Sequence, residues 1–79
     1  MKTYVFRVEL EPDEEGWRAF YPPLEELGAS TWGESQDAAL EHIQEVLTMI
    51  VEERIDAKEP IHEQDGVAAP EGQLVSVTL

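Results

Sequence analysis

The sequence of 79 residues contains no cysteine, only five basic residues and no long hydrophobic run. Without cysteine there can be no disulfide, no thiolate metal site and no thiol nucleophile. No segment approaches the roughly 20 apolar residues that span a bilayer, and Arg7 lies where a secretory signal would need an apolar core. We therefore expect a cytoplasmic protein that forms a single domain over residues 1–79.

Because basic residues are so few, the net charge is −13, with 18 Asp and Glu against five Lys and Arg. A chain this acidic repels phosphate backbones and anionic lipids, so we expect no direct binding to nucleic acid or to a membrane. A basic protein is the complementary partner. The alternative is that the charge only keeps a small domain in solution.

The hydrophobic pattern predicts four strands and one long helix. Alternation places Tyr4, Phe6 and Val8 on one face of the first strand, and Ser35 is the expected N-cap of the helix. The expected strands are residues 3–10, 17–21, 29–32 and 73–79, the expected helix is 36–57, and 58–72 form a long polar loop. A loop of this length in a small domain is typical of a mobile or a binding segment.

This order predicts a two-layer α+β sandwich, βββαβ, in which one helix covers one face of a mostly antiparallel sheet. The first two strands form a hairpin, because residues 11–16 supply proline, acidic turn formers and a glycine. The right-handed crossover rule predicts that strand four runs parallel to strand one.

The helix has an acidic face opposite its apolar arc. At 100° per residue this face contains Asp37, Glu41, Glu45, Glu52 and Asp56, with Met49 beside them. We call these six residues the acidic ridge. Like charges four residues apart weaken a helix, and no lysine is interleaved to relieve them. We expect the ridge to bind a basic partner; the alternative is an ordinary solvated helix face.

Strand 17–21 carries aromatic residues on both of its faces. Trp17 and Tyr21 share one face, and Phe20 lies on the other with Arg18. Only one face of the sheet can contact the helix, so a large apolar group is left on the other. We therefore expect a homo-oligomer that forms through the open sheet face or an edge strand, with Trp17, Phe20 and Tyr21 as candidate interface residues.

No combination of residues indicates catalysis, a metal or a cofactor. The first strand carries one acid within its predicted bounds, Glu9, and residues 73–79 carry none, so no carboxylate cluster for a divalent ion forms across these strands. His42 and His62 are expected on the helix surface and in the loop, too far apart for a paired metal site. The serines lack a nucleophile elbow, and no glycine-rich phosphate loop is present.

A series of short motifs runs through the chain: Tyr4-Val-Phe-Arg-Val8, Gly16-Trp17, Pro23-Leu24, Leu27-Gly28, Gly33-Glu34-Ser35, Ala39-Leu40, Ile43, Leu47 and Glu59-Pro-Ile61. In this order and spacing they resemble the HicB family of antitoxins from prokaryotic toxin–antitoxin systems. The resemblance implies a partial ribonuclease H-like fold without a working nuclease site. It also implies binding to a small basic ribonuclease toxin of the HicA type, whose active site and RNA surface the domain masks.

Relatives that repress their own operon carry an added DNA-binding segment after this domain, and the present sequence shows none, so direct DNA binding is not expected. The sequence thus predicts a non-enzymatic HicB-like module that occludes a toxin. Two alternatives stay open: a degenerate ribonuclease H-like metal-dependent nuclease, and an orphan oligomeric structural or ligand-binding module that has no toxin partner.

Overall fold

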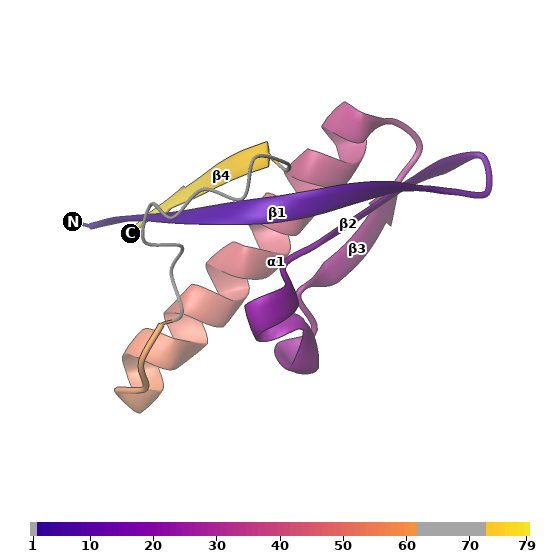
Figure 1. The fold of residues 1–79 in the computed structure, drawn as a ribbon. Helices are drawn as coiled ribbons and strands as arrows, with labels where there is room; N and C mark the ends of the chain where they lie inside the picture. Colours follow the sequence, from indigo (N-terminus) through magenta and orange to yellow (C-terminus); the bar gives the residue numbers. More distant parts are fainter. Residues whose placement is uncertain (1, 62–72) are drawn as a thin grey trace.

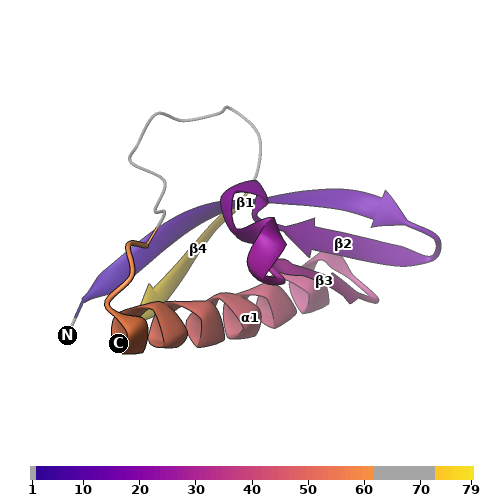
Figure 2. The same cartoon turned by 90° about the horizontal axis from the view of Figure 1, so that it is seen from below.

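A four-stranded sheet covered on one face by a single long helix forms the protein (Figure 1). The structure, a computed structural model, describes residues 2–61 and 73–79. Its strands are β1 (Thr3–Asp13), β2 (Gly16–Phe20), β3 (Ser30–Gly33) and β4 (Gln73–Thr78), and its helices are the 3₁₀ helix η1 (Pro22–Leu27) and the α-helix α1 (Gln36–Ala57). The predicted two-layer α+β architecture and the order βββαβ are confirmed (Figure 2).

The sheet has the strand order β3-β2-β1-β4, and every neighbouring pair is antiparallel. The prediction that strand four runs parallel to strand one was therefore wrong: Thr3 pairs with Thr78, and Val8 pairs with Gln73. The crossover rule holds for a connection that crosses the sheet once. Here α1 ends near the chain termini (Figure 2), whereas β4 begins at the opposite end of its pairing with β1. From there β4 runs back toward the chain termini, antiparallel to β1.

The β1–β2 hairpin is longer than predicted, because β1 continues to Asp13, which pairs with Gly16. Pro12 is tolerated in β1 because β4 extends only as far as Val8, so that β1 has a free edge at the proline. A Cβ atom at Gly16 would lie 2.2 Å from the ring of Trp32. Only glycine fits there, and the indole packs directly over the hairpin.

The core lies between the sheet and α1. Tyr4, Phe6 and Val8 of β1 are buried on the face that meets the helix, as the alternation predicts. The ring of Phe6 meets that of Tyr21 edge to face, with 5.1 Å between the ring centres. The helix buries Ala39, Ile43, Leu47, Ile50 and Val51. Because these residues fix the rotation of α1 about its axis, the opposite side of the helix must face solvent.

The bounds of α1 agree with the predicted helix. The Ser35 side chain accepts a hydrogen bond from the Ala38 N–H at 3.0 Å, which confirms the expected N-cap. At the other end Lys58 adopts the left-handed conformation, with φ of 56°, and its N–H donates to the carbonyl groups of Arg54 and Ile55. Both ends of the helix are therefore capped, so the ridge that the helix carries is presented on a well-defined element.

Side chains of α1 contact the backbone of both edge strands. A ring nitrogen of His42, Nδ1, lies 2.8 Å from the carbonyl oxygen of Trp32 in β3, and Nε2 of Gln44 donates to the carbonyl oxygen of Ser76 in β4 at 2.9 Å. An edge strand offers its backbone groups to other chains unless they are occupied. The helix occupies one such group on each edge of the sheet.

Candidate protein-binding surfaces

All six residues of the acidic ridge are exposed on the side of α1 that faces away from the sheet. The ridge extends from Asp37 to Asp56, which is about 29 Å at the rise of about 1.5 Å per helical residue. Met49, the one apolar member, is 64 % exposed. The folded chain thus brings the predicted residues together in one elongated strip on the outer surface of the helix layer.

No cation neutralises the ridge within residues 2–61 and 73–79. The ion pairs found there join Arg18 to Glu11 and Glu25, and Arg54 to Glu59, all of which lie outside the ridge. Arg54 is the only basic residue in α1 and is itself half-buried. Side chains four residues apart on a helix are about 5–6 Å apart at Cβ, so the ridge carboxylates repel one another.

The sheet face opposite the helix forms a second surface. Cross-strand pairing places Arg7 beside Leu74, and Glu9 beside Phe20. We call this surface the open face, and its larger side chains are Val5, Arg7, Glu9, Glu11, Arg18, Phe20, Trp32 and Leu74. Trp32 is 45 % exposed and Leu74 is 61 % exposed. The face therefore mixes apolar groups with charges of both signs.

Of the three predicted interface residues, only Phe20 lies on the open face. Tyr21 is 1 % exposed in the core, and Trp17 packs against the core on the same side of β2. Tyr21 is therefore unavailable to a second chain, which corrects the prediction. The register of the hairpin explains the error: Ala19 pairs with Leu10, whose side chain lies on the core side of β1, and Tyr21 follows Ala19 at the spacing of one strand face.

Sequence reasoning missed two exposed apolar residues of the open face, Trp32 and Leu74. The signal that could have found them is the period of two along each strand. Leu74 alternates with Val75 and Val77, which face the core, and Trp32 pairs across the sheet with Arg18. Neither residue stands out by composition alone, because the face of a strand becomes known only when its pairing is known.

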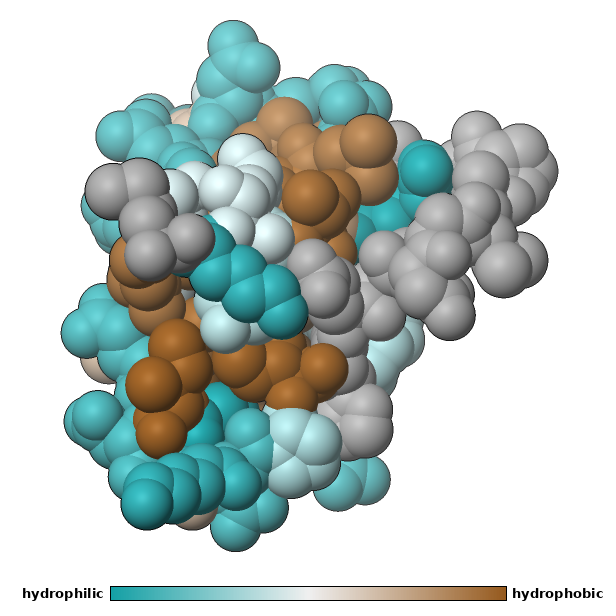
Figure 3. Space-filling model, turned by 90° about the vertical axis from the view of Figure 1, so that its left-hand side faces the viewer, coloured by the Kyte–Doolittle hydropathy of each residue, from teal (hydrophilic) through white to brown (hydrophobic). Residues whose placement is uncertain are grey.

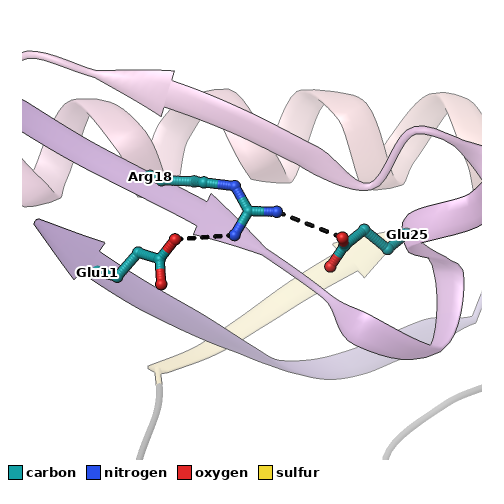
Figure 4. A network of polar contacts seen from close by, with 3 residues as sticks. All are labelled: Glu11, Arg18 and Glu25. Carbon is teal, nitrogen blue, oxygen red and sulfur yellow. Dashed lines mark hydrogen bonds and ion pairs between the residues drawn. The ribbon is translucent and has the colours of Figure 1, made fainter. Parts of the chain in front are cut away.

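Arg18 is held in place by two carboxylates and an aromatic ring (Figure 4). Its Nη1 donates to Glu11 Oε1 at 3.0 Å, and Nη2 lies 3.3 Å from Glu25 Oε2. The guanidinium carbon lies 4.0 Å from the centre of the Phe20 ring, within the range of a cation–π contact. This network joins β1, β2 and η1, and it neutralises Arg18 within the chain.

Arg7, on the same face, has no such partners among residues 2–61 and 73–79. Its Nε atom is buried without a hydrogen-bond partner, and none of the ion pairs in the described part of the chain includes Arg7 or Glu9. A buried polar group without a partner costs about 1–3 kcal/mol.

The described residues contain no group of three or more His, Asp or Glu side chains that could hold a metal ion. His42 lies on the helix surface, as predicted, where its ring nitrogen bonds the Trp32 backbone. His62 lies outside the described residues, as does most of the predicted loop. In residues 2–61 and 73–79 no helix has both the length and the apolar character that crossing a membrane requires.

A shallow groove of about 260 Å³ lies between η1 and the end of α1, where the 58–72 loop begins. Its lining residues are Leu27, Ile50, Glu53, Arg54, Ala57 and Glu59. Arg54 and Glu59 approach to 3.6 Å across one side of it. Hydrophobic patches interrupted by polar side chains also appear at the end of the molecule where the termini lie (Figure 3).

A comparison with solved structures shows which known fold this is. The chain superimposes on the N-terminal domain of the antitoxin HicB from Burkholderia pseudomallei with a TM-score of 0.60 and 21 % sequence identity. The match covers 99 % of this chain and 98 % of that domain. No family model and no curated protein matches the sequence. The fold is thus that of a HicB-like domain, in agreement with the resemblance seen in the sequence.

Proposed function

We propose that this chain is an antitoxin-type binding module that occludes a small basic ribonuclease toxin of the HicA type with its acidic ridge. The observation that carries the proposal is the ridge itself: six exposed residues on one side of α1, five of them carboxylates, with no ion pair to any of them in the described residues. The HicB-like fold supports the antitoxin role, because the matched domain belongs to an antitoxin.

The ridge favours a basic protein over nucleic acid. Its carboxylates repel phosphates, whereas a ribonuclease needs a positive surface to attract its RNA substrate. The strip of about 29 Å is long enough to cover much of such a surface on a small domain. Bound there, the carboxylates of the ridge would occupy the cations that otherwise hold RNA, and the helix would block access sterically.

The proposed role is binding without catalysis, and we place it in the cytoplasm, where a toxin that cleaves RNA would act. The purified chain is expected to leave RNA intact in the presence of Mg²⁺ or Mn²⁺. Cleavage that depends on the metal would instead favour the degenerate nuclease.

The proposal is tested by growth rescue with the short basic protein encoded by the neighbouring reading frame. Induction of that protein alone is expected to halt growth, and co-expression of this chain is expected to restore it. The variant Glu41→Lys/Glu45→Lys should fail to rescue, because it places two cations on the ridge. The matched control Glu15→Lys/Glu26→Lys makes the same change in net charge at exposed positions outside α1 and should rescue fully. Equal rescue by both variants would remove the ridge from the mechanism.

A further inference from the structure

β4 forms one margin of the sheet, and it carries neither charge nor proline (Figure 1). The edge of a sheet offers backbone N–H and C=O groups to other chains, and proteins commonly block it with charged side chains, with proline or with a very short strand. β4 has six residues, none of them charged, in a chain that is 29 % charged. It therefore lacks the features that usually keep a further strand away.

The pairing of β4 with β1 determines which of its backbone groups point outward. Lys2 and Leu79 each donate to the carbonyl oxygen of the other, at 2.8 and 3.0 Å, which identifies a hydrogen-bonded pair. Such pairs recur at every second residue of an antiparallel ladder. Val75 and Val77 therefore direct their N–H and C=O groups toward β1. The alternate residues direct theirs away from it: Leu74, Ser76 and Thr78.

A hydrogen bond from α1 supports this assignment. Nε2 of Gln44 donates to the carbonyl oxygen of Ser76 at 2.9 Å, so this carbonyl group points outside the β1–β4 pair. The donor is an amide N–H, as a backbone donor would be. A carbonyl oxygen has two lone pairs and can accept a second hydrogen bond. The outer edge of β4 therefore binds an amide that does not belong to the sheet.

The opposite margin of the sheet, β3, is less able to accept a strand. It has only four residues, and the two that point outward by the same alternation are Ser30 and Trp32. The Ser30 N–H already donates to the carbonyl oxygen of Gly28 at 2.8 Å. The Trp32 carbonyl oxygen lies 2.8 Å from Nδ1 of His42. β3 is thus shorter than β4, and its outward groups are more fully occupied.

A groove beside the outer edge of β4 fits the side chains of an added strand. Its volume is about 260 Å³, and residues of α1 and β4 line it: Leu40, Glu41, Gln44, Leu74, Val75 and Ser76. Every second side chain of a strand points to the same face. An apolar side chain of the added strand would therefore lie against Leu40, and the side chain two residues along would reach Glu41. Glu41 is the only charged side chain among these lining residues, so the groove favours a cation at that position.

We propose that a strand at a sheet edge of the basic partner pairs with β4, so that one sheet extends across both chains, and that a lysine or arginine of this strand binds Glu41. In such strand addition, main-chain hydrogen bonds supply affinity and side-chain pockets supply specificity. A second copy of this chain fits the edge poorly, because it brings a further net charge of −13. The inference rests on the proposed function and deepens it, since Glu41 belongs to both the groove and the ridge.

Amide hydrogen exchange, resolved by residue with NMR, tests the pairing directly. The probe is the short basic protein encoded by the neighbouring reading frame, added at saturation to the wild-type chain. We expect the amides of Leu74, Ser76 and Thr78 to exchange at least about tenfold more slowly in the complex than in the free chain. The amides of Val75 and Val77 are the internal control: they bond to β1 and should be protected both with and without the partner.

A substitution at Ser76 tests the same edge by affinity. Ser76→Pro removes an outward N–H but no hydrogen bond to β1, and an edge strand tolerates proline at such a position. It should raise the dissociation constant for the partner at least about tenfold, because it removes one hydrogen bond and places the ring against the incoming strand. The matched control Ser76→Ala keeps the N–H and should stay within about threefold of wild type. Circular dichroism confirms that each variant is folded.

Binding of the partner without protection of the outward amides would overturn the inference and leave the proposed function intact. Equal weakening by Ser76→Pro and Ser76→Ala would also overturn it, and so would protection of these amides when this chain alone is concentrated, which would place a second copy at the edge. A partner that does not bind wild type at all would contradict the proposed function together with the inference. The exchange measurement uses wild type, so it remains decisive if Ser76→Pro does not fold.

Discussion

Glu41 lies between two other carboxylates of the ridge, and its replacement by glutamine is expected to stabilise the fold while it weakens binding. Asp37 and Glu45 lie four residues from it on either side, and all three are exposed. Each such like-charge pair destabilises a helix by roughly 0.2–0.5 kcal/mol. Glu41→Gln removes both pairs and hardly changes helix propensity, so the free energy of unfolding should rise by about 0.4–1 kcal/mol.

For a domain of this size, 1 kcal/mol shifts the melting temperature by about 4–8 °C, so Glu41→Gln should raise it by about 2–8 °C at low ionic strength. In 1 M NaCl the Debye length is about 3 Å, shorter than the separation of the side chains, and the gain should largely vanish. Thermal unfolding followed by circular dichroism at about 20 mM and about 1 M NaCl measures both values.

The control is Glu53→Gln, because Glu53 is also exposed on α1 but has Met49 and Ala57 four residues away. It loses the same charge but relieves only one repulsion, with Asp56 three residues away, so its melting temperature should rise by less. If Glu41→Gln were neutral or destabilising at low salt, or if its gain persisted unchanged in 1 M NaCl, the reasoning that the ridge carries uncompensated repulsion would be refuted.

Two further predictions concern the backbone. Gly16→Ala should destabilise the fold by about 1–3 kcal/mol in thermal unfolding. The reason is that the new Cβ would lie 2.2 Å from the Trp32 ring and 2.5 Å from the Gly33 carbonyl oxygen. An unchanged melting temperature would show that the indole does not pack there. Lys58→Gly should stabilise the fold by about 1 kcal/mol, because Lys58 holds φ of 56° at the end of α1. Lys58→Ala is its matched control. If both variants raised the free energy of unfolding equally, the cause would be the lost charge and not the backbone conformation.

The elements of this fold could be predicted from the sequence because their signals are local. The helix bounds agree because Ser35 supplies the N-cap and the apolar positions keep their helical spacing from Ala39 to Val51. The core face of β1 follows from strict alternation. The ridge was predicted for the same reason, since the rotation of α1 is set by residues of α1 itself.

The direction of β4 could not be predicted in this way, because it depends on the path of the chain between α1 and Gln73. No residue of β4 determines whether the strand runs parallel or antiparallel to β1. Val75 and Val77 alternate with exposed residues, and this pattern is the same for both strand directions. The assignment of Tyr21 failed for a related reason. Which face of β2 meets the helix depends on the pairing of Ala19 with Leu10, a property of the hairpin rather than of strand two.

The most direct test of the central claim is the affinity of this chain for the basic protein encoded by the neighbouring reading frame, measured by titration calorimetry at two salt concentrations. The account predicts that Glu41→Lys/Glu45→Lys raises the dissociation constant at least about 100-fold at roughly 50 mM salt and by a smaller factor at roughly 300 mM. Glu15→Lys/Glu26→Lys should stay within about threefold of wild type. Equal affinities for wild type and the ridge variant at both salt concentrations would contradict the claim that this chain binds its partner through the acidic face of α1.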